Sequence, residues 1–274
     1  MINLLAAESQ RLWARRMTRF FPAILALLMV AGVVIAYLVI NGDDSNSPDF
    51  VNDIAGGLEA SSLFGPITTL LPVMAFVIGA SSIGADSKTG MLEQLLTWEP
   101  RRLRLLGARL LAVASGVGLL VMALGLVLVG LLYALAASTG TVDGTTGELW
   151  ANVAVALLRL GVASALFAAF GVGITLLVDN SVGSIVGFVI YWFIVENFLV
   201  ALFLPKVHVY LPVNNADSFA SGTDIERIDG SVFTETGPDF VTEHSYIVAG
   251  VILAGWVALA VVASGLVFNR RDVA

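Results

Sequence analysis

Two charged side chains lie inside long apolar stretches of the sequence, Arg159 and Glu196. A charge in the hydrocarbon core of a membrane is costly unless it is paired or hydrated, so each residue is a candidate for function. The two stretches are joined by a short turn at 178–181, and a rise of 1.5 Å per residue places both charges roughly 10–12 Å below the outer boundary. We predict an Arg159–Glu196 pair, direct or bridged by water. The pair either fixes the hairpin or borders a polar translocation path; snorkelling of each charge without a partner is the third interpretation.

A second candidate site is a short apolar helix in the segment 84–105, which connects two other apolar stretches. Pro100 discourages helix just before it, so the helix is expected to end near Trp98. An apolar helix at the membrane surface must be covered by membrane or by another protein, and the residues alone leave both coverings open. Its apolar residues are Met91, Leu92, Leu95, Leu96 and Trp98, and its polar neighbours are Lys88, Glu93 and Glu99.

The first nineteen residues form a predicted amphipathic helix. At 100° per residue, one side carries Ile2, Leu5, Leu12, Trp13, Met17 and Phe20. The other side carries Glu8, Arg11, Arg15, Thr18 and Arg19, which predicts a helix lying in the plane of the lipid headgroups. A plain positively charged anchor explains the same residues equally well.

The sequence contains several apolar stretches that are long enough to span a membrane and hold these residues in it. The chain has 274 residues, of which 58% are hydrophobic and 13% charged, and this composition excludes a single soluble domain. The predicted fold is an all-α membrane protein, one domain over 1–274, with an interfacial helix at 1–19. Its six predicted spans are about 20–40, 61–83, 106–137, 152–178, 182–204 and 245–268.

The distribution of Lys and Arg predicts the orientation of these spans. Lys206 and Arg227 fall on one side, and eleven basic residues fall on the other, which should be cytoplasmic together with both termini. The segment 84–105 then becomes a cytoplasmic loop and 205–244 an extracellular one. The eleven are Arg11, Arg15, Arg16, Arg19, Lys88, Arg101, Arg102, Arg104, Arg109, Arg270 and Arg271.

Several chemistries have no residues to support them. The chain has no cysteine and no Gly-x-x-x-x-Gly-Lys-Ser/Thr loop, and its two histidines, His208 and His244, are far apart and predicted to lie on the surface. We therefore expect no enzyme active site, no metal and no cofactor bound by this chain. The net charge of −7 argues against nucleic acid as a partner.

The loop 84–105 carries a pattern that resembles the type-2 ABC transporter permease family. The tail at 268–273 also looks like the usual end of that family, and six spans with inside termini agree with it. Asp86 stands where Glu is commoner and Arg109 where Lys is commoner, and both preserve the charge. The matching residues are Asp86, Gly90, Leu92, Leu95, Leu96, Thr97, Pro100, Arg101, Leu105, Leu106 and Arg109.

This resemblance implies a function. In such a permease the loop is a coupling helix that docks on a separate ATPase subunit, and ATP and Mg²⁺ are bound there. Met91, Leu92, Leu95, Leu96 and Trp98 would be apolar docking contacts, with Lys88, Glu93 and Glu99 at their polar edge. The N-terminal helix, with Arg11, Trp13, Arg15 and Arg19, would support them.

The expected protein is thus the permease subunit of a bacterial ABC exporter, in the plasma membrane. A second copy or a paralogue would complete the pathway, and related permeases often have short re-entrant helices at 205–244. A secondary transporter or channel independent of ATP, and a membrane scaffold or sensor, are the alternatives.

Overall fold

The computed structural model describes residues 2–14, 18, 20, 22–27, 29–31, 34, 65–88, 102–139, 145–200, 203–229 and 239–270. This part of the chain is mostly helical, and four of its helices are long and apolar enough to cross a membrane. They are Leu103–Ala134, Gly147–Val178, Ser181–Val200 and Tyr246–Asn269, which match the last four predicted spans. Of the first predicted span, 20–40, the structure describes 20, 22–27, 29–31 and 34, and the apolar helix Pro22–Ala31 found there is shorter than a membrane span.

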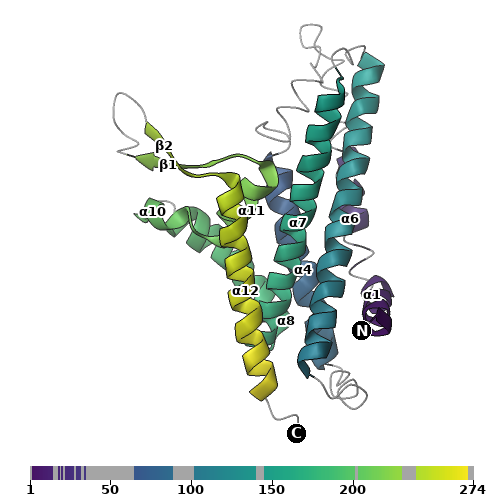
Figure 1. Ribbon diagram of the computed structural model, residues 1–274, viewed down its shortest axis with the longest axis vertical. Helices are drawn as coiled ribbons and strands as arrows, with labels where there is room; N and C mark the ends of the chain where they lie inside the picture. The colour runs from purple at the N-terminus through teal and green to yellow at the C-terminus, as the bar shows by residue number, and fades with distance from the viewer. Residues whose placement is uncertain are drawn as a thin grey trace.

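Figure 1 shows the arrangement of the described elements. A hairpin of two antiparallel strands, with Arg227 opposite Val241, is an exception to the predicted all-α class. In order they are α1 (Ile2–Ala14), α4 (Gly65–Lys88), α6 (Arg102–Thr139), α7 (Gly147–Val178), α8 (Ser181–Ile190), the π-helix η1 (Tyr191–Val200), α10 (Pro205–His208), α11 (Pro212–Ser221), β1 (Ile225–Asp229), β2 (Asp239–His244) and α12 (Tyr246–Arg270).

Helix α7 is the centre of the bundle, packed against α4, α6, α8, α11 and α12. In its most apolar stretch 67% of the residues are buried, against 22% in the stretch of α8 and η1. Its backbone crosses α4 closely, because a Cβ at Gly79 would collide with the carbonyl oxygen of Ala168 and a Cβ at Gly171 with that of Phe76. Small residues thus serve packing within the chain here.

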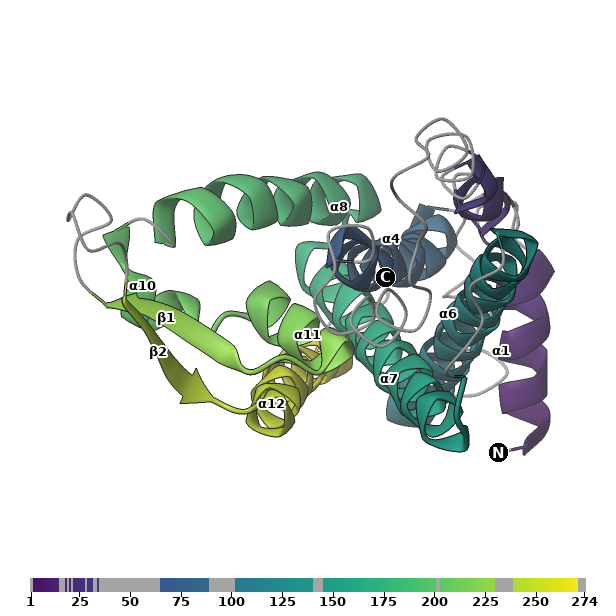
Figure 2. The same cartoon turned by 90° about the horizontal axis from the view of Figure 1, so that it is seen from above.

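Aromatic rings attach α8 to this centre. Phe188 stacks on Phe76 with ring centroids 3.9 Å apart, and its ring lies edge-on to Phe167 and Phe170. Beyond α8 the helix continues as η1 and points away from the bundle toward α10 (Figure 2). Its side chains Phe193, Ile194 and Phe198 are exposed accordingly.

The segments predicted to lie inside gather toward one end of the bundle. Helix α1, the turn between α7 and α8 and the C-terminal end of α12 all lie there (Figure 1). The turn is tight because Asp179 adopts a left-handed conformation and the Asn180 side chain accepts hydrogen bonds from the backbone N–H groups of Val182 and Gly183. That this end of the bundle is cytoplasmic stays a prediction.

The segment 205–244, predicted to be an extracellular loop in which related permeases often have short re-entrant helices, contains two short helices and two strands. Its first half returns into the bundle, where the indole Nε1 of Trp256 donates a hydrogen bond to the carbonyl oxygen of Tyr210 at 2.9 Å. Trp256 lies about 15 Å along α12 from the start of that helix. Pro205 and Pro212 each begin a short helix at this depth, as proline readily does in a first turn.

Candidate functional site

The predicted docking helix itself lies outside the described residues. Lys88 ends α4 and Arg102 begins α6, so the two ends of the connection are placed. The docking residues outside the described part are Met91, Leu92, Glu93, Leu95, Leu96, Trp98 and Glu99. Arg15 and Arg19 of the predicted interfacial helix also fall outside, whereas Arg11 and Trp13 lie on α1.

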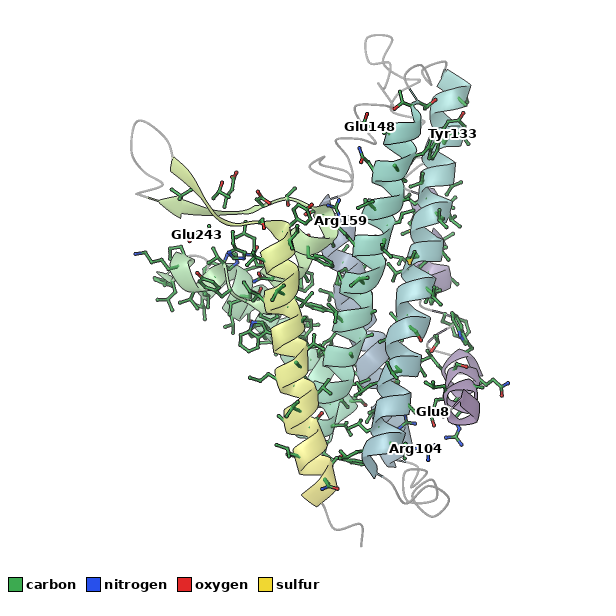
Figure 3. The ribbon with its side chains drawn as sticks, in the orientation of Figure 1. Glu8, Arg104, Tyr133, Glu148, Arg159 and Glu243 are labelled. Atoms are coloured by element: carbon green, nitrogen blue, oxygen red, sulfur yellow. The ribbon has the colours of Figure 1, made fainter. Side chains whose placement is uncertain are left out.

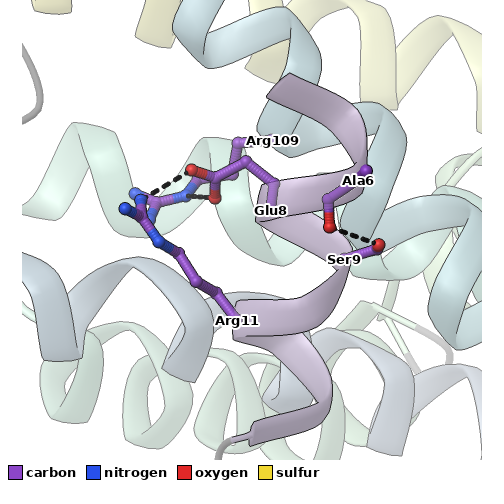
Figure 4. A network of polar contacts seen from close by, with 5 residues as sticks. All are labelled: Ala6, Glu8, Ser9, Arg11 and Arg109. Atoms are coloured by element: carbon purple, nitrogen blue, oxygen red, sulfur yellow. Dashed lines mark hydrogen bonds and ion pairs between the residues drawn. The ribbon is translucent and has the colours of Figure 1, made fainter. Parts of the chain in front are cut away.

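A buried charge network joins α1 to α6 (Figure 4). The Nε of Arg109 donates to Glu8 Oε2 at 3.2 Å, and Arg11 donates to Glu8 Oε1 at 3.0 Å. The side chains of Glu8 and Arg109 are each 4% exposed. Breaking a buried ion pair is costly, so the contact between Glu8 and Arg109 fixes α1 against α6.

The prediction that Glu8 lies on the polar, solvent side of the amphipathic helix is therefore wrong. Glu8 and Leu12 form the face that packs on α6, with Leu12 against Gly116, while Trp13 is 42% exposed. Thr18, also predicted on the polar side, is buried. The partner of Glu8 is 101 residues away, beyond the reach of helical periodicity. One sequence signal was available, since Glu8 is the only acidic residue among residues 1–42.

Arg159, in α7, reaches the C-terminal end of the short helix α11. Its guanidinium donates to the carbonyl oxygen of Ser221 at 3.4 Å and lies 5.1 Å from the centre of the Tyr246 ring. It also fills the space beside Gly222, where a Cβ would collide with it. Gly222 caps α11 with a φ of 82°, a conformation that glycine adopts without strain. Figure 3 shows Arg159 at the side of α7 that faces this cap.

Glu196, in η1, reaches the opposite end of α11. Its Oε1 accepts a hydrogen bond from the backbone N–H of Asn214 at 2.7 Å, and the side chain is buried. The residue at the N-cap of α11 is Leu211, which makes no side-chain cap. Glu196 therefore supplies from another helix the acceptor that the first turn of α11 lacks.

The two intramembrane charges thus meet one helix and not each other. Among the described residues, Arg159 and Glu196 form no ion pair together, which differs from the predicted pair. The carboxylate lies at the N-terminal end of α11 and the guanidinium at its C-terminal end, and both positions are favoured by the helix dipole. Asn214 and Ser221 are about 10 Å apart along the helix axis.

The π-helix η1 sets the direction of Glu196. In this winding residues five apart share a face, which brings Tyr191 beside the Glu196 carboxylate. The side-chain Nδ2 of Asn197 donates to the carbonyl oxygen of Trp192 at 3.0 Å, also five residues back. The predicted span 182–204 includes this segment, but the ordinary helical period does not predict its π winding.

A polar cluster continues from α11 to the strands. Asn215 is fully buried; its Nδ2 donates to the carbonyl oxygens of Val209 and Leu211, and its Oδ1 is 3.1 Å from Nε2 of His244. His208 is only partly exposed, and burial lowers its pKa below the usual value. Neither histidine is the simple surface residue that we predicted.

The ends of the bundle carry different side chains. Tyr133 and Trp150 lie against each other at the end opposite Arg104, with ring centroids 5.8 Å apart (Figure 3). About 44 Å of helix separates Arg104 from Tyr133, the thickness of a bilayer with its headgroups. Tyr and Trp are common at both boundaries of a membrane, and basic side chains are in excess at the cytoplasmic one. No group of three or more metal-ligating side chains occurs in the described ranges.

Comparisons with known proteins give a family without an assigned activity. Residues 20–274 match the family described as a protein of unknown function, DUF2705. A search of curated proteins finds no match. Since the matched range covers most of the chain, the protein belongs to the DUF2705 family.

Proposed function

We propose that this protein is the membrane-spanning permease subunit of an ATP-driven ABC exporter. The segment 86–100 docks on a separate ATPase subunit, which binds ATP and Mg²⁺. A second copy of the chain or a paralogue completes the pathway. The four membrane helices and the loop motif support this proposal.

The observation that carries the proposal is the buried Glu8–Arg109 contact. Arg109 is seven residues beyond the start of α6, about 10 Å from the end of the docking segment. Movement of that segment would therefore be transmitted to α6 and α1 together. Rigid-body motion of this kind is how a docked ATPase would reorient the spans.

The opposite end of the pathway would be controlled by α11. This helix is short, packs against α4, α7 and α12, and is held by Glu196 and Arg159 at its two ends. Displacement of α11 would expose the polar backbone groups at its ends to the interior of the bundle. In the proposed exporter, α11 is the outer gate.

The docking segment can be tested by introducing a charge into its apolar side. Met91→Asp and Leu95→Asp should each abolish co-purification with the native ATPase partner, because a carboxylate would be buried at the contact. Gln94→Asp introduces the same charge on the polar side and should leave co-purification intact. All three proteins should insert equally, as measured in isolated membranes.

Unimpaired co-purification of both Met91→Asp and Leu95→Asp would remove the docking role. The alternative of a transporter independent of ATP would need polar groups inside the membrane, for which Arg159 and the buried Glu196 are candidates. Transport that survives ATP depletion would support that alternative.

A further inference from the structure

An apolar groove lies between the first turns of α6 and the last turns of α12. It has a volume of 320 Å³, and eight of its nine lining residues have no polar side chain. Leu106 and Leu110 form one wall, Val261 forms the other, and Asn269 is the polar residue. The lining of α6, from Leu103 to Leu110, covers about 10 Å along the axis, so the groove occupies one end of the membrane helices.

Two glycines keep this groove open. A Cβ at Gly107 would meet no atom within 4 Å, and a Cβ at Gly265 would only come into ordinary contact with Leu103 and Leu106. The neighbouring side chains Leu103, Val262 and Leu266 are 58%, 61% and 60% exposed. The groove therefore faces the surroundings of the bundle, which in a membrane are lipid chains.

Basic residues of the sequence stand at the two helix ends beside the groove, and we call the space between these ends its mouth. Arg102 and Arg104 begin α6, whose first turn contains no acidic residue, and Arg270 ends α12. In the sequence, 101–104 contains three arginines, and 269–272 contains two arginines and one aspartate. The N-terminus of α6 adds a partial positive charge. An apolar groove below a basic mouth is complementary to a negatively charged headgroup with an acyl chain.

We propose that this groove is a binding site for one acyl chain of an anionic phospholipid, whose phosphate lies at the mouth between the ends of α6 and α12. The volume of 320 Å³ is at the lower end of the range for ligand sites, about 300–1,000 Å³, and suits one chain. The site is independent of the exporter proposal. It needs only that α6 and α12 cross a membrane.

Lipid retention by the purified full-length protein tests the site. The protein is incubated with vesicles of equal parts phosphatidylglycerol and phosphatidylcholine, extracted in mild detergent, and its bound lipids are counted by native mass spectrometry. Gly107→Leu and Gly265→Leu fill the groove and should lower phosphatidylglycerol retention about tenfold. Gly130→Leu on α6 and Gly255→Leu on α12 are matched controls, since a Cβ at either position also meets no atom within 4 Å.

The headgroup is tested separately. Replacing Arg102 and Arg104 by Gln should reduce the preference for phosphatidylglycerol over phosphatidylcholine. Equal retention of both lipids by the unaltered protein would overturn the proposal. So would equal loss of phosphatidylglycerol in the groove variants and in the Gly130→Leu and Gly255→Leu controls.

Discussion

Helices α1 and α11 are both short, and both are held against long membrane helices by buried charges, but they are held in different ways. On α1 the charges meet side chain to side chain, with Glu8 between Arg11 and Arg109. On α11 the charges come from other helices and meet its backbone ends, with Glu196 at Asn214 and Arg159 at Ser221.

The two arrangements differ in which contacts the charged groups lose when each helix moves. Separating α1 from α6 would break the contact between the buried charges of Glu8 and Arg109, and the cost of breaking it strongly opposes separation. Displacing α11 takes one backbone hydrogen bond from Arg159, which keeps its contact with the Tyr246 ring. It takes the Asn214 hydrogen bond from Glu196, which keeps Tyr191 beside it. We infer that α1 moves with α6 as one body, whereas α11 can move on its own.

The largest expected effect comes from breaking the α1 contact. Glu8→Leu removes the carboxylate that Arg109 contacts on α1 and should lower the free energy of unfolding by about 3 kcal/mol. The double variant Glu8→Leu with Arg109→Leu should recover most of this loss, because no charge is then buried. Unfolding by SDS, followed by tryptophan fluorescence, measures both.

Gln10→Leu is the matched control on α1, since Gln10 is exposed on the same helix. It should leave the unfolding free energy nearly unchanged. Purely additive losses in Glu8→Leu and Arg109→Leu would show that the two side chains do not depend on each other.

A smaller effect is expected at the N-terminal end of α11. Glu196→Ala removes the only acceptor that the structure assigns to the Asn214 N–H among the described residues and should lower the unfolding free energy by about 2 kcal/mol. Glu196→Gln keeps an acceptor and should lower it by about half as much. Combined with Arg159→Ala, the losses should add to within about 0.5 kcal/mol, because the two residues hold opposite ends of α11.

Additive losses are expected if Arg159 and Glu196 hold α11 separately, whereas a direct pair would give a coupling energy. A coupling energy between Arg159 and Glu196 as large as that between Glu8 and Arg109 would restore the direct pair predicted from the sequence. The same SDS titration supplies the comparison.

The cap of α11 should show an effect of about 1–2 kcal/mol. Gly222→Ala places a side chain at a φ of 82° and against the Arg159 guanidinium, so it should destabilise the protein. Gly130→Ala on α6 is the control, because its Cβ would be in open space and alanine favours helix. If Gly222→Ala unfolds at the same SDS concentration as the unaltered protein, α11 does not need this cap.

The smallest effect concerns pH. Burial lowers the pKa of His208 in the folded protein, so the unfolded chain takes up the proton first as the pH falls. The unfolding free energy should therefore decrease below about pH 6.5, the usual pKa of histidine, and be fully retained above it. His208→Asn should reduce this slope, whereas Lys206→Gln on the same short helix should not. An unchanged slope in His208→Asn would contradict the assignment.

Much of the helical framework could be predicted from the sequence because apolar length alone identifies a membrane helix. Helix α7 begins at Gly147, earlier than the predicted 152, since Thr146 caps it by accepting a hydrogen bond from Leu149 N–H and Glu148 stands in its first turn. These are readable signals. Arg159 and Glu196 were recognised as important by their cost in a membrane.

Their partners could not be predicted, for a physical reason. The contacts of Glu8, Arg159 and Glu196 join residues 101, 62 and 18 positions apart, so they depend on how helices pack and not on the period of any one helix. The strands at 225–229 and 239–244 were missed because hydropathy assigns them only to a polar loop.

The winding of η1 has a consequence for the length of the chain in this segment. In an ordinary α-helix Tyr191 and Glu196 would point about 140° apart, and only the wider turn aligns them. A DUF2705 protein with one residue fewer between these two positions would achieve the same alignment with ordinary winding. A change in helical winding can thus compensate for the insertion or deletion of a single amino acid here. We expect relatives to differ in helical pitch while the residue equivalent to Glu196 keeps facing α11.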